Sequence, residues 1–237
     1  MKNYLLILFT IILSSENNYA QSPENKNKTT VNYWNANRTY TYQIIYTDST
    51  NQELTKEDLL IEPTGEIWEA DKKQTLADFS VNFRSADSIK LAPYPINEKM
   101  KPWLRKWQEG VIQNESKIWM HPVRQNQYQL TEIAPFPEVK LPIELHKKWN
   151  NTLWIYKAFG SFEGTVESEY EVIAFEERNY SFGKRWCWKI NASGHHNKLG
   201  ENNVIYYFDE HYGFTEMHYH FFNGHKISLV LQTMTEE

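Results

Sequence analysis

Cysteine is nearly absent from this chain of 237 residues, because Cys187 is the only one. A single thiol excludes a disulfide within the chain, so the folded state has to be held together by its core. Basic residues are also few: 25 Lys and Arg stand against 30 Asp and Glu, which gives a net charge of −5. Without an excess or a run of basic residues, the composition argues against nucleic acid as a partner.

Long apolar runs are confined to the start of the chain. An apolar stretch from Leu5 to Leu13 follows Lys2, and polar residues lead from there to Ala20. This layout is typical of a secretory signal peptide, so residues 1–20 are predicted to be removed on export to the periplasm or beyond the cell. No later segment is apolar for long enough to span a bilayer, so no transmembrane segment is expected after removal.

Beyond residue 20, the sequence predicts a short polar tail followed by one domain. Residues 21–30, QSPENKNKTT, are polar and predict a flexible tail. Residues 31–237 are expected to form a single β-rich domain, in which the four prolines of segment 122–142 mark the only plausible seam.

Aromatic residues are plentiful, with 9 Trp, 15 Tyr and 12 Phe, and they favour sheet over helix. Alternation is clearest in 40–46 and 77–83, where Tyr, Ile, Phe and Val recur at every second position. A hairpin is predicted over 61–68 with Pro63, Thr64 and Gly65 at its tip. The predicted fold is mainly β: one strongly curved antiparallel sheet, a half-barrel, with a short covering helix.

Segment 97–110 is the candidate for that helix. Pro102 suits a first helical position, Trp103 and Trp107 lie one turn apart on an apolar face, and Gly110 can end the helix. The two tryptophans are expected to form a lid over the concave side of the sheet, where they could contact an apolar ligand.

Three stretches carry a resemblance to a known group: WMHPVRQNQYQLTEIAPFPEVKLP from Trp119, the KKW that follows it, and YYFDEHYGFTEMHYHFFNGHKISLVL from Tyr206. They resemble uncharacterised exported bacterial proteins of the TapB-like group. The resemblance covers the second half of the chain and implies a curved half-barrel sheet like that of the LolA and LolB lipoprotein carriers. It also implies an exported address, and it supplies no active residues.

The stretch FTEMHYHFFNGHKISLVL, from Phe214 to Leu231, predicts a hairpin. If Asn223-Gly224 is a two-residue turn, His220 pairs with Ile227 and His218 with Leu229. Alternation then places one set of side chains on the concave face, where they would contact a lipid-like or other apolar ligand: Phe214, His218, His220 and Phe222.

Histidines also raise the possibility of a metal site. His195 and His196 are expected at the same end of the sheet as the Asn223-Gly224 turn, near His220 and His225. Four imidazoles there could hold zinc, but no fixed ligand spacing such as HExxH or CxxC is present. Solvated loop histidines are the favoured alternative, so no cofactor is assigned.

Other catalytic patterns are missing. There is no GxSxG motif and no Gly-rich loop between a strand and a helix. Cys187 lies between Trp186 and Trp188 in a predicted strand, which favours a packing role over a nucleophile. Glu167, Glu169 and Glu171 share one strand face and are expected to be solvated.

Three functions remain open in the sequence. The favoured one is an exported, non-enzymatic binding or envelope-associated protein whose aromatic concave face, with Trp103 and Trp107 above it, holds an apolar ligand. The second is a metal-binding protein or metal-dependent enzyme that uses His195, His196, His220 and His225. The third is a surface structural or attachment protein, which would need a protein partner that the sequence does not name.

Overall fold

The computed structural model describes residues 31–237, except for 84, 92–96 and 98–102. The predicted signal peptide and tail therefore lie outside the described residues. No helix in the described part of the chain is both long and apolar enough to cross a membrane.

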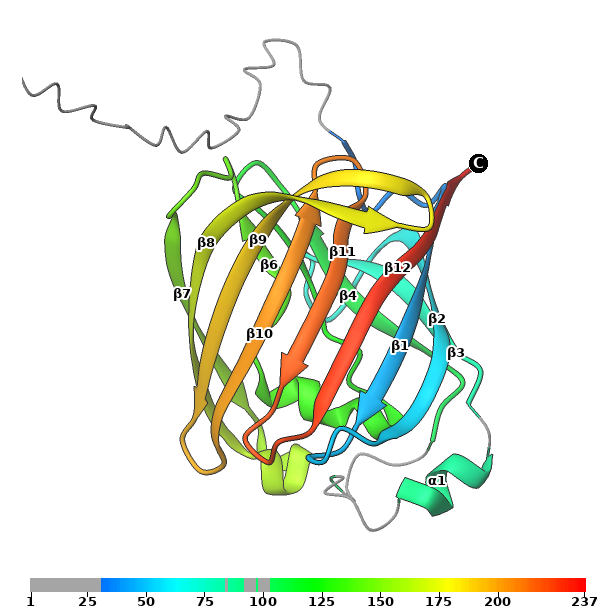
Figure 1. Ribbon diagram of the computed structural model, residues 1–237, viewed down its shortest axis with the longest axis vertical. Coiled ribbons are helices and arrows are strands. Elements are labelled where there is room, and N and C mark those ends of the chain that lie inside the picture. Colours follow the sequence, from blue (N-terminus) through cyan, green and yellow to red (C-terminus); the bar gives the residue numbers. More distant parts are fainter. Residues whose placement is uncertain (1–30, 84, 92–96, 98–102) are drawn as a thin grey trace, which may run out of the picture.

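One antiparallel sheet forms the body of the protein and curls until it is nearly a closed barrel (Figure 1). Its twelve strands run in the order β6-β5-β4-β3-β2-β1-β12-β11-β10-β9-β8-β7, so β6 and β7 are its edges. The prediction of a strongly curved antiparallel sheet is confirmed, and half-barrel understates its closure. The strands are β1 Arg38–Thr47, β2 Glu53–Ile67, β3 Thr75–Val81, β4 Lys106–Gln113, β5 Lys117–Met120, β6 Glu138–Lys140, β7 Lys148–Ile155, β8 Gly164–Tyr180, β9 Gly183–His196, β10 Gly200–Asp209, β11 Gly213–His220 and β12 Lys226–Glu236.

Alternating burial holds most strands in place. In β1, Tyr40, Tyr42, Ile44 and Tyr46 are buried while the residues between them are partly exposed. In β3, Ala77, Phe79 and Val81 point into the same core. The period-two pattern therefore predicts these strands and their inner faces correctly, because one face must bury its apolar side chains.

The helix predicted over 97–110 is wrong where it can be tested. Lys106–Gln113 is strand β4, and Trp107 and Gly110 lie inside it. Trp103 precedes the strand in irregular chain, and residues 98–102 lie outside the described residues. The described α-helix is α1, Ser85–Leu91, which buries Leu91. A strand pairing with β3 outweighs the helical pattern, because it buries Trp107 against Phe79 with ring centroids 5.9 Å apart.

The hairpin tip predicted at Pro63, Thr64 and Gly65 is also wrong. Strand β2 runs through these residues to Ile67, with an irregular register against β3 between Pro63 and Ile67. The chain turns later, where Asp71 N–H donates to the Trp68 carbonyl and Gln74 N–H donates to the Asp71 carbonyl. Gly65, at φ +73°, therefore marks an irregularity within a strand and not the end of one.

The β11–β12 hairpin differs from its prediction by one residue. His220 pairs with Lys226 and His218 with Ser228, where Ile227 and Leu229 were expected. The turn holds three residues between Phe221 and His225, with Gly224 at φ +82°. A one-residue change in loop length exchanges the two faces of β11 relative to β12 near the turn, so His218 and His220 leave the core side to Met217 and Tyr219.

A segment of the chain itself fills the interior of the curled sheet. All eight residues of the 3₁₀ helix η1, Asn126–Ile133, are buried, and the proline-rich stretch that follows leads into β6. The sheet donates to its carbonyls: Asn202 Nδ2 donates to Ile133 O at 2.8 Å and Tyr170 OH to Phe136 O at 3.0 Å, and Tyr206 OH donates to Pro135 O. The residues from Pro122 to Pro137 are called the internal segment below, and three of their buried carbonyls are satisfied by side chains of the sheet.

Charged groups inside the curl are paired through the internal segment. Arg124 lies 2.8 Å from Glu109 and 3.2 Å from Glu132, and both carboxylates are buried. Burial raises the pKa of Glu109 to about 7, and Arg124 reduces that rise without cancelling it. One guanidinium shared by two carboxylates thus ties β4 to the internal segment.

A second 3₁₀ helix, η2, Lys157–Phe162, follows β7 at the opposite end of the molecule from the β8–β9 hairpin (Figure 1). That hairpin is long and arches over the outside of the sheet, where Ser181 Oγ donates to Gln232 O of β12 at 2.7 Å. Its residues Arg178 to Arg185 are called the arm below.

Gly194 of β9 makes room for the internal segment. A Cβ on Gly194 would lie 2.7 Å from Pro135 Cδ, well inside van der Waals contact. We expect Gly194→Ala to lower the free energy of unfolding by about 1–3 kcal/mol, the usual cost of overpacking a core. Urea unfolding of the variant measures this loss.

Ser193→Ala is the matched control, because Ser193 directly precedes Gly194 in β9 and is not fully buried. Its stability should stay within about 0.5 kcal/mol of the parent. Equal stability of the two variants would show that Pro135 does not press against β9 as described.

Candidate functional site

The two edges of the sheet overlap. On β5, Ile118 and Met120 point into the core, so Trp119 between them points away from it. On β8, Tyr170 is directed toward the inside of the curl, yet Tyr170 and Trp119 line the same pocket. At this overlap, the edge formed by β5 and β6 therefore lies inside the curl, and the face of β5 that carries Trp119 lies against the inner face of β7 and β8.

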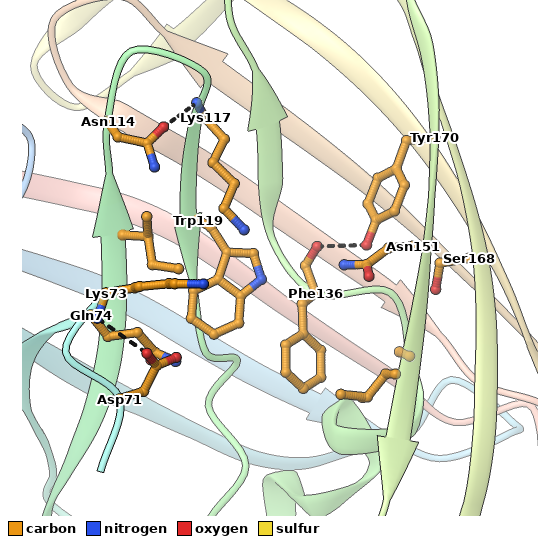
Figure 2. A pocket seen from close by; sticks show the side chains of 13 residues that line it. Asp71, Lys73, Gln74, Asn114, Lys117, Trp119, Phe136, Asn151, Ser168 and Tyr170 are labelled. Atoms are coloured by element: carbon orange, nitrogen blue, oxygen red, sulfur yellow. Dashed lines mark hydrogen bonds between the residues drawn. The ribbon is translucent and has the colours of Figure 1, made fainter. Parts of the chain in front are cut away.

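A pocket of about 500 Å³ lies in this overlap and is called the seam pocket below. Figure 2 shows Trp119 and Phe136 between strand β5 and the strand that carries Tyr170. The pocket is lined by Asp71, Lys73, Gln74, Ile112, Asn114, Lys117, Trp119, Ala134, Phe136, Asn151, Leu153, Ser168 and Tyr170. Four elements thus contribute: the β2–β3 turn, the β4–β5 hairpin, the internal segment and the β7–β8 pair.

Aromatic rings form one wall of the seam pocket. The centroids of Trp119 and Phe136 are 5.9 Å apart, and His121 packs behind both at 4.7 Å and 5.4 Å. Burial lowers the pKa of His121 to about 3, so its imidazole is neutral at physiological pH. The wall is therefore an uncharged aromatic surface, which suits the apolar face of a ligand.

Cationic side chains stand at the same wall. Lys117 Nζ lies 5.6 Å from the centroid of Trp119 and 3.5 Å from Glu138, which is buried. Figure 2 shows Lys73 extending from the β2–β3 turn toward Trp119. Asp71 accepts from Gln74 Nε2 at 3.0 Å, and this hydrogen bond lowers its pKa. Lys117 therefore contacts the indole, and Lys73 lines the same pocket.

Polar side chains complete the pocket on both sides. On the wall opposite Trp119, Asn151 of β7 and Ser168 of β8 are directly paired across the two strands. On the same side as Trp119, Asn114 lies in the β4–β5 turn, where its Oδ1 accepts from the backbone N–H of Ser116 at 2.9 Å. Amides and hydroxyls both donate and accept, so the seam pocket can match a ligand that carries several hydroxyl groups.

The side chains predicted to bind an apolar ligand do not meet on one concave face. Phe214 and Trp107 are packed into the core, whereas Phe222 lies in the β11–β12 turn and is 39% exposed. His218 and His220 lie on the outer face, because the three-residue turn moved them there. Trp103 packs against Phe83 before β4 with ring centroids 5.5 Å apart and belongs to no lid helix.

The four histidines considered as a possible zinc site, with solvated loop histidines as the favoured alternative, are also dispersed. His196 is fully buried: its Nε2–H donates to Phe162 O at 3.0 Å, and its Nδ1 accepts the backbone N–H of Lys198 at 3.1 Å. His195, on the opposite face, pairs with Glu201 at 2.6 Å. His225 contacts Tyr46, and His220 is exposed. Within the described residues, no three His, Cys, Asp or Glu side chains are grouped so as to hold a metal ion.

A Ser–His–Glu chain on the outer face was missed in the sequence. His218 Nδ1 lies 3.1 Å from Ser228 Oγ, and His218 Nε2 lies 2.7 Å from Glu216 Oε2. Only the true register shows it, since it places His218 directly opposite Ser228. The distances are those of a nucleophile and its base, but these residues do not line the seam pocket, nor either of two further pockets, one around Asn150 and one around Trp68.

Glu216 serves the arm more directly than it serves His218. Arg178 binds its carboxylate through two hydrogen bonds of 2.9 Å, and Tyr180 OH donates to it at 2.8 Å. Burial alone would raise the pKa of Glu216, but the hydrogen bonds from His218, Arg178 and Tyr180 outweigh it and hold the pKa at about 2. These hydrogen bonds fasten the arm to β11. Glu216 with Arg178, Tyr180 and His218 is called the clasp below.

Cys187 lies beside the clasp. It is buried, lies 3.7 Å from Thr215 Oγ1 and has a pKa raised by burial, so the packing role predicted for it is consistent with its surroundings. Glu167 and Glu169 are exposed on the outer face, and Glu171 is partly exposed beside Lys148, in agreement with a solvated row of carboxylates.

Comparisons with known proteins give little sequence likeness. No protein-family model matches the chain, and no curated protein matches its sequence. Among solved structures, a "putative exported protein with YmcC-like fold" from Bacteroides fragilis is 10% identical, with a TM-score of 0.49 over 85% of this chain and 97% of its own.

Two further solved structures are similar at the same level. A "putative lipoprotein" from Parabacteroides distasonis is 9% identical, with a TM-score of 0.49 over 88% of this chain and 100% of its own. The "hypothetical lipoprotein YmcC" from Escherichia coli is 8% identical, with a TM-score of 0.38 over 82% and 84%. Likeness at this level carries no argument about function, and the TapB-like resemblance stays a prediction.

The lowered pKa of Glu216 predicts how the free energy of unfolding depends on pH. The folded pKa of Glu216, about 2, lies below its ordinary value of 4.5, so its contribution is complete above pH 4.5 and is lost as the pH falls toward 2. We expect Glu216→Gln to remove roughly 2 kcal/mol of stability at pH 6 and much less at pH 2.5. Urea unfolding at the two pH values measures both losses.

Glu177→Gln is the control, since Glu177 forms an exposed pair with Lys184 at 2.7 Å beside the arm. This pair should contribute less than about 1 kcal/mol at either pH. If Glu216→Gln and Glu177→Gln had the same small effect, the arm would not be fastened through Glu216.

Proposed function

We propose that this is an exported, non-enzymatic binding protein, and that its ligand occupies the seam pocket. Export is supported by the signal-peptide pattern of residues 1–20. The observation that carries the binding proposal is a pocket of about 500 Å³, within the usual range for small-molecule sites, that combines aromatic, amide, hydroxyl and ammonium groups.

The geometry favours a small polar ligand over a lipid. The inner face once expected to take an acyl chain is covered by the internal segment, whose carbonyls accept from Tyr170, Tyr206 and Asn202. The seam pocket offers polar side chains on three of its elements, and each would lose its water to an acyl chain without a hydrogen bond in return. An envelope-associated role remains compatible with this proposal.

The positions of the four histidines do not support the metal-dependent alternative, because within the described residues they are not grouped so as to hold an ion. His195 and His196 point to opposite faces of β9, and both ring nitrogens of His196 already have partners. The Ser228–His218–Glu216 chain does not replace it, because Arg178 holds the carboxylate and no described pocket receives a substrate beside Ser228.

Blocking the seam pocket tests the proposal. Asn151 lines it, so Asn151→Trp should fill it, whereas Asn150 does not line it and belongs to a separate pocket beside it, so Asn150→Trp should leave the seam pocket open. We expect at least one member of a panel of oligosaccharides, nucleotides, amino acids and dodecanoate to give a saturation-transfer NMR signal with the parent protein. Asn150→Trp should keep that signal, and Asn151→Trp should weaken the affinity obtained by titrating the signal at least about tenfold, equivalent to about 1.4 kcal/mol.

Dodecanoate is expected to give no signal that depends on Asn151. Binding of dodecanoate that Asn151→Trp abolishes would restore the lipid-like ligand. Binding of every panel member with equal strength to both variants, or no binding at all, would overturn the seam pocket as the site.

A further inference from the structure

We infer that the ligand of the seam pocket is an acidic saccharide, whose sugar ring lies against Trp119 and whose carboxylate is held by Lys73 and Lys117. This inference rests on the proposed function and names the ligand class for the same site. It depends on three features of the pocket: its charge, its aromatic wall and its hydrogen-bonding groups.

Charge in and beside the seam pocket is unbalanced. Three ammonium groups, of Lys73, Lys117 and Lys140, face two carboxylates, of Asp71 and Glu138. Glu138 is shared between Lys117 at 3.5 Å and Lys140 at 3.1 Å, and the Asp71 carboxylate already accepts two hydrogen bonds from its own turn. One positive charge is thus left for an anion: Lys73 is exposed, whereas Lys117 is partly withdrawn from water, where a charge interaction is stronger than at the open surface.

Trp119 shows where the uncharged part of such a ligand would lie. The indole is buried, with 8% of its surface exposed, so it offers contact to part of one ring and not to a long chain. The wall behind it is closed by Phe136 and the neutral His121. Sugars present C–H groups on one ring face and hydroxyls around the rim, and the apolar face matches an aromatic wall that has polar groups beside it.

The hydroxyl rim of a sugar finds partners on both sides of the ring. Asn151 and Ser168 belong to the β7–β8 wall, and Asn114 and Gln74 belong to the wall across from it. These side chains can donate to or accept from hydroxyls, whose own chemistry is equally two-sided. Asn114 Oδ1 and Gln74 Nε2 already have partners in their own turns, so a purely apolar acid would leave their remaining polar atoms without a match in the ligand, together with those of Asn151 and Ser168.

Nucleotides fit the seam pocket less well, although they also combine a ring with negative charge. Phosphates are usually held by arginine forks or by backbone N–H groups of Gly-rich loops. The residues that line the pocket include no Arg and no Gly. Two flexible lysines suit the single charge of a carboxylate better than the dense charge of a polyphosphate.

Matched ligands test the inference. We would titrate the protein, purified after export, by calorimetry with oligomers of galacturonate and glucuronate and with sialic acid, each beside its own methyl ester. The ester keeps the ring and the hydroxyls and removes the charge. At least one acid should bind ten or more times more tightly than its ester, and added salt should reduce this difference.

Matched variants test the two lysines. Lys73→Gln should remove most of the preference for the acid, whereas Lys72→Gln should keep it, because Lys72 is an exposed neighbour that does not line the pocket. Lys117→Gln should act like Lys73→Gln. Since Lys117 also pairs with the buried Glu138, Lys73→Gln gives the decisive result should Lys117→Gln fail to fold.

The outcomes separate the inference from the proposed function. Equal binding of acids and esters, both blocked by Asn151→Trp, would overturn the acidic ligand and keep the pocket. No saccharide binding, together with another panel member blocked by Asn151→Trp, would do the same. Acid binding that survives Asn151→Trp, or no Asn151-dependent binding of any compound, would overturn both.

Discussion

The rest of the structure depends on how the backbone of the internal segment is satisfied inside the sheet. Around the end of the 3₁₀ helix η1, the chain from Ile133 to Pro137 forms neither a continuing helix nor a strand, and burying its carbonyls without partners would cost several kcal/mol each. Side chains of two strands solve this: Asn202 and Tyr206 of β10 and Tyr170 of β8 donate to the carbonyls of Ile133, Pro135 and Phe136. These donors explain why fully buried tyrosines lie among apolar neighbours, and they fix the internal segment against the inner wall.

Filling the interior in this way decides where a ligand can bind. The internal segment leads directly into β6, so the edge β4–β5–β6 is drawn inside the curl and cannot pair with β7. The two edges overlap, and the space between them is bounded by Trp119 on one side and by Asn151 and Ser168 on the other. Closure of the sheet and formation of the seam pocket are thus two consequences of one packing arrangement. The arm lies on the outer face of the sheet, where Arg178 fastens it to Glu216 of β11.

The sequence predicts the class of fold and most strands, because a face that buries Tyr40 or Phe79 has to alternate with a solvated one. It fails where one residue changes the geometry. Asn223-Gly224 is compatible with two loop lengths, and only the tertiary structure chooses the three-residue turn that sends His218 and His220 outward. The seam pocket could not be predicted at all, since its walls lie as far apart in the chain as Lys73 and Ser168 and meet only through the overlap of the edges.

The most direct test of this account is the indole N–H spectrum of the tryptophan-labelled protein during titration with the tightest-binding acidic saccharide. Trp119→Phe and Trp107→Phe assign the two signals that matter, one in the seam pocket and one in the filled interior. The account predicts that the Trp119 signal moves with saturation of the ligand and that the Trp107 signal stays in place. Movement of Trp107 without Trp119 would mean that the ligand enters the interior, and the account of a filled sheet with its site at the seam would be contradicted.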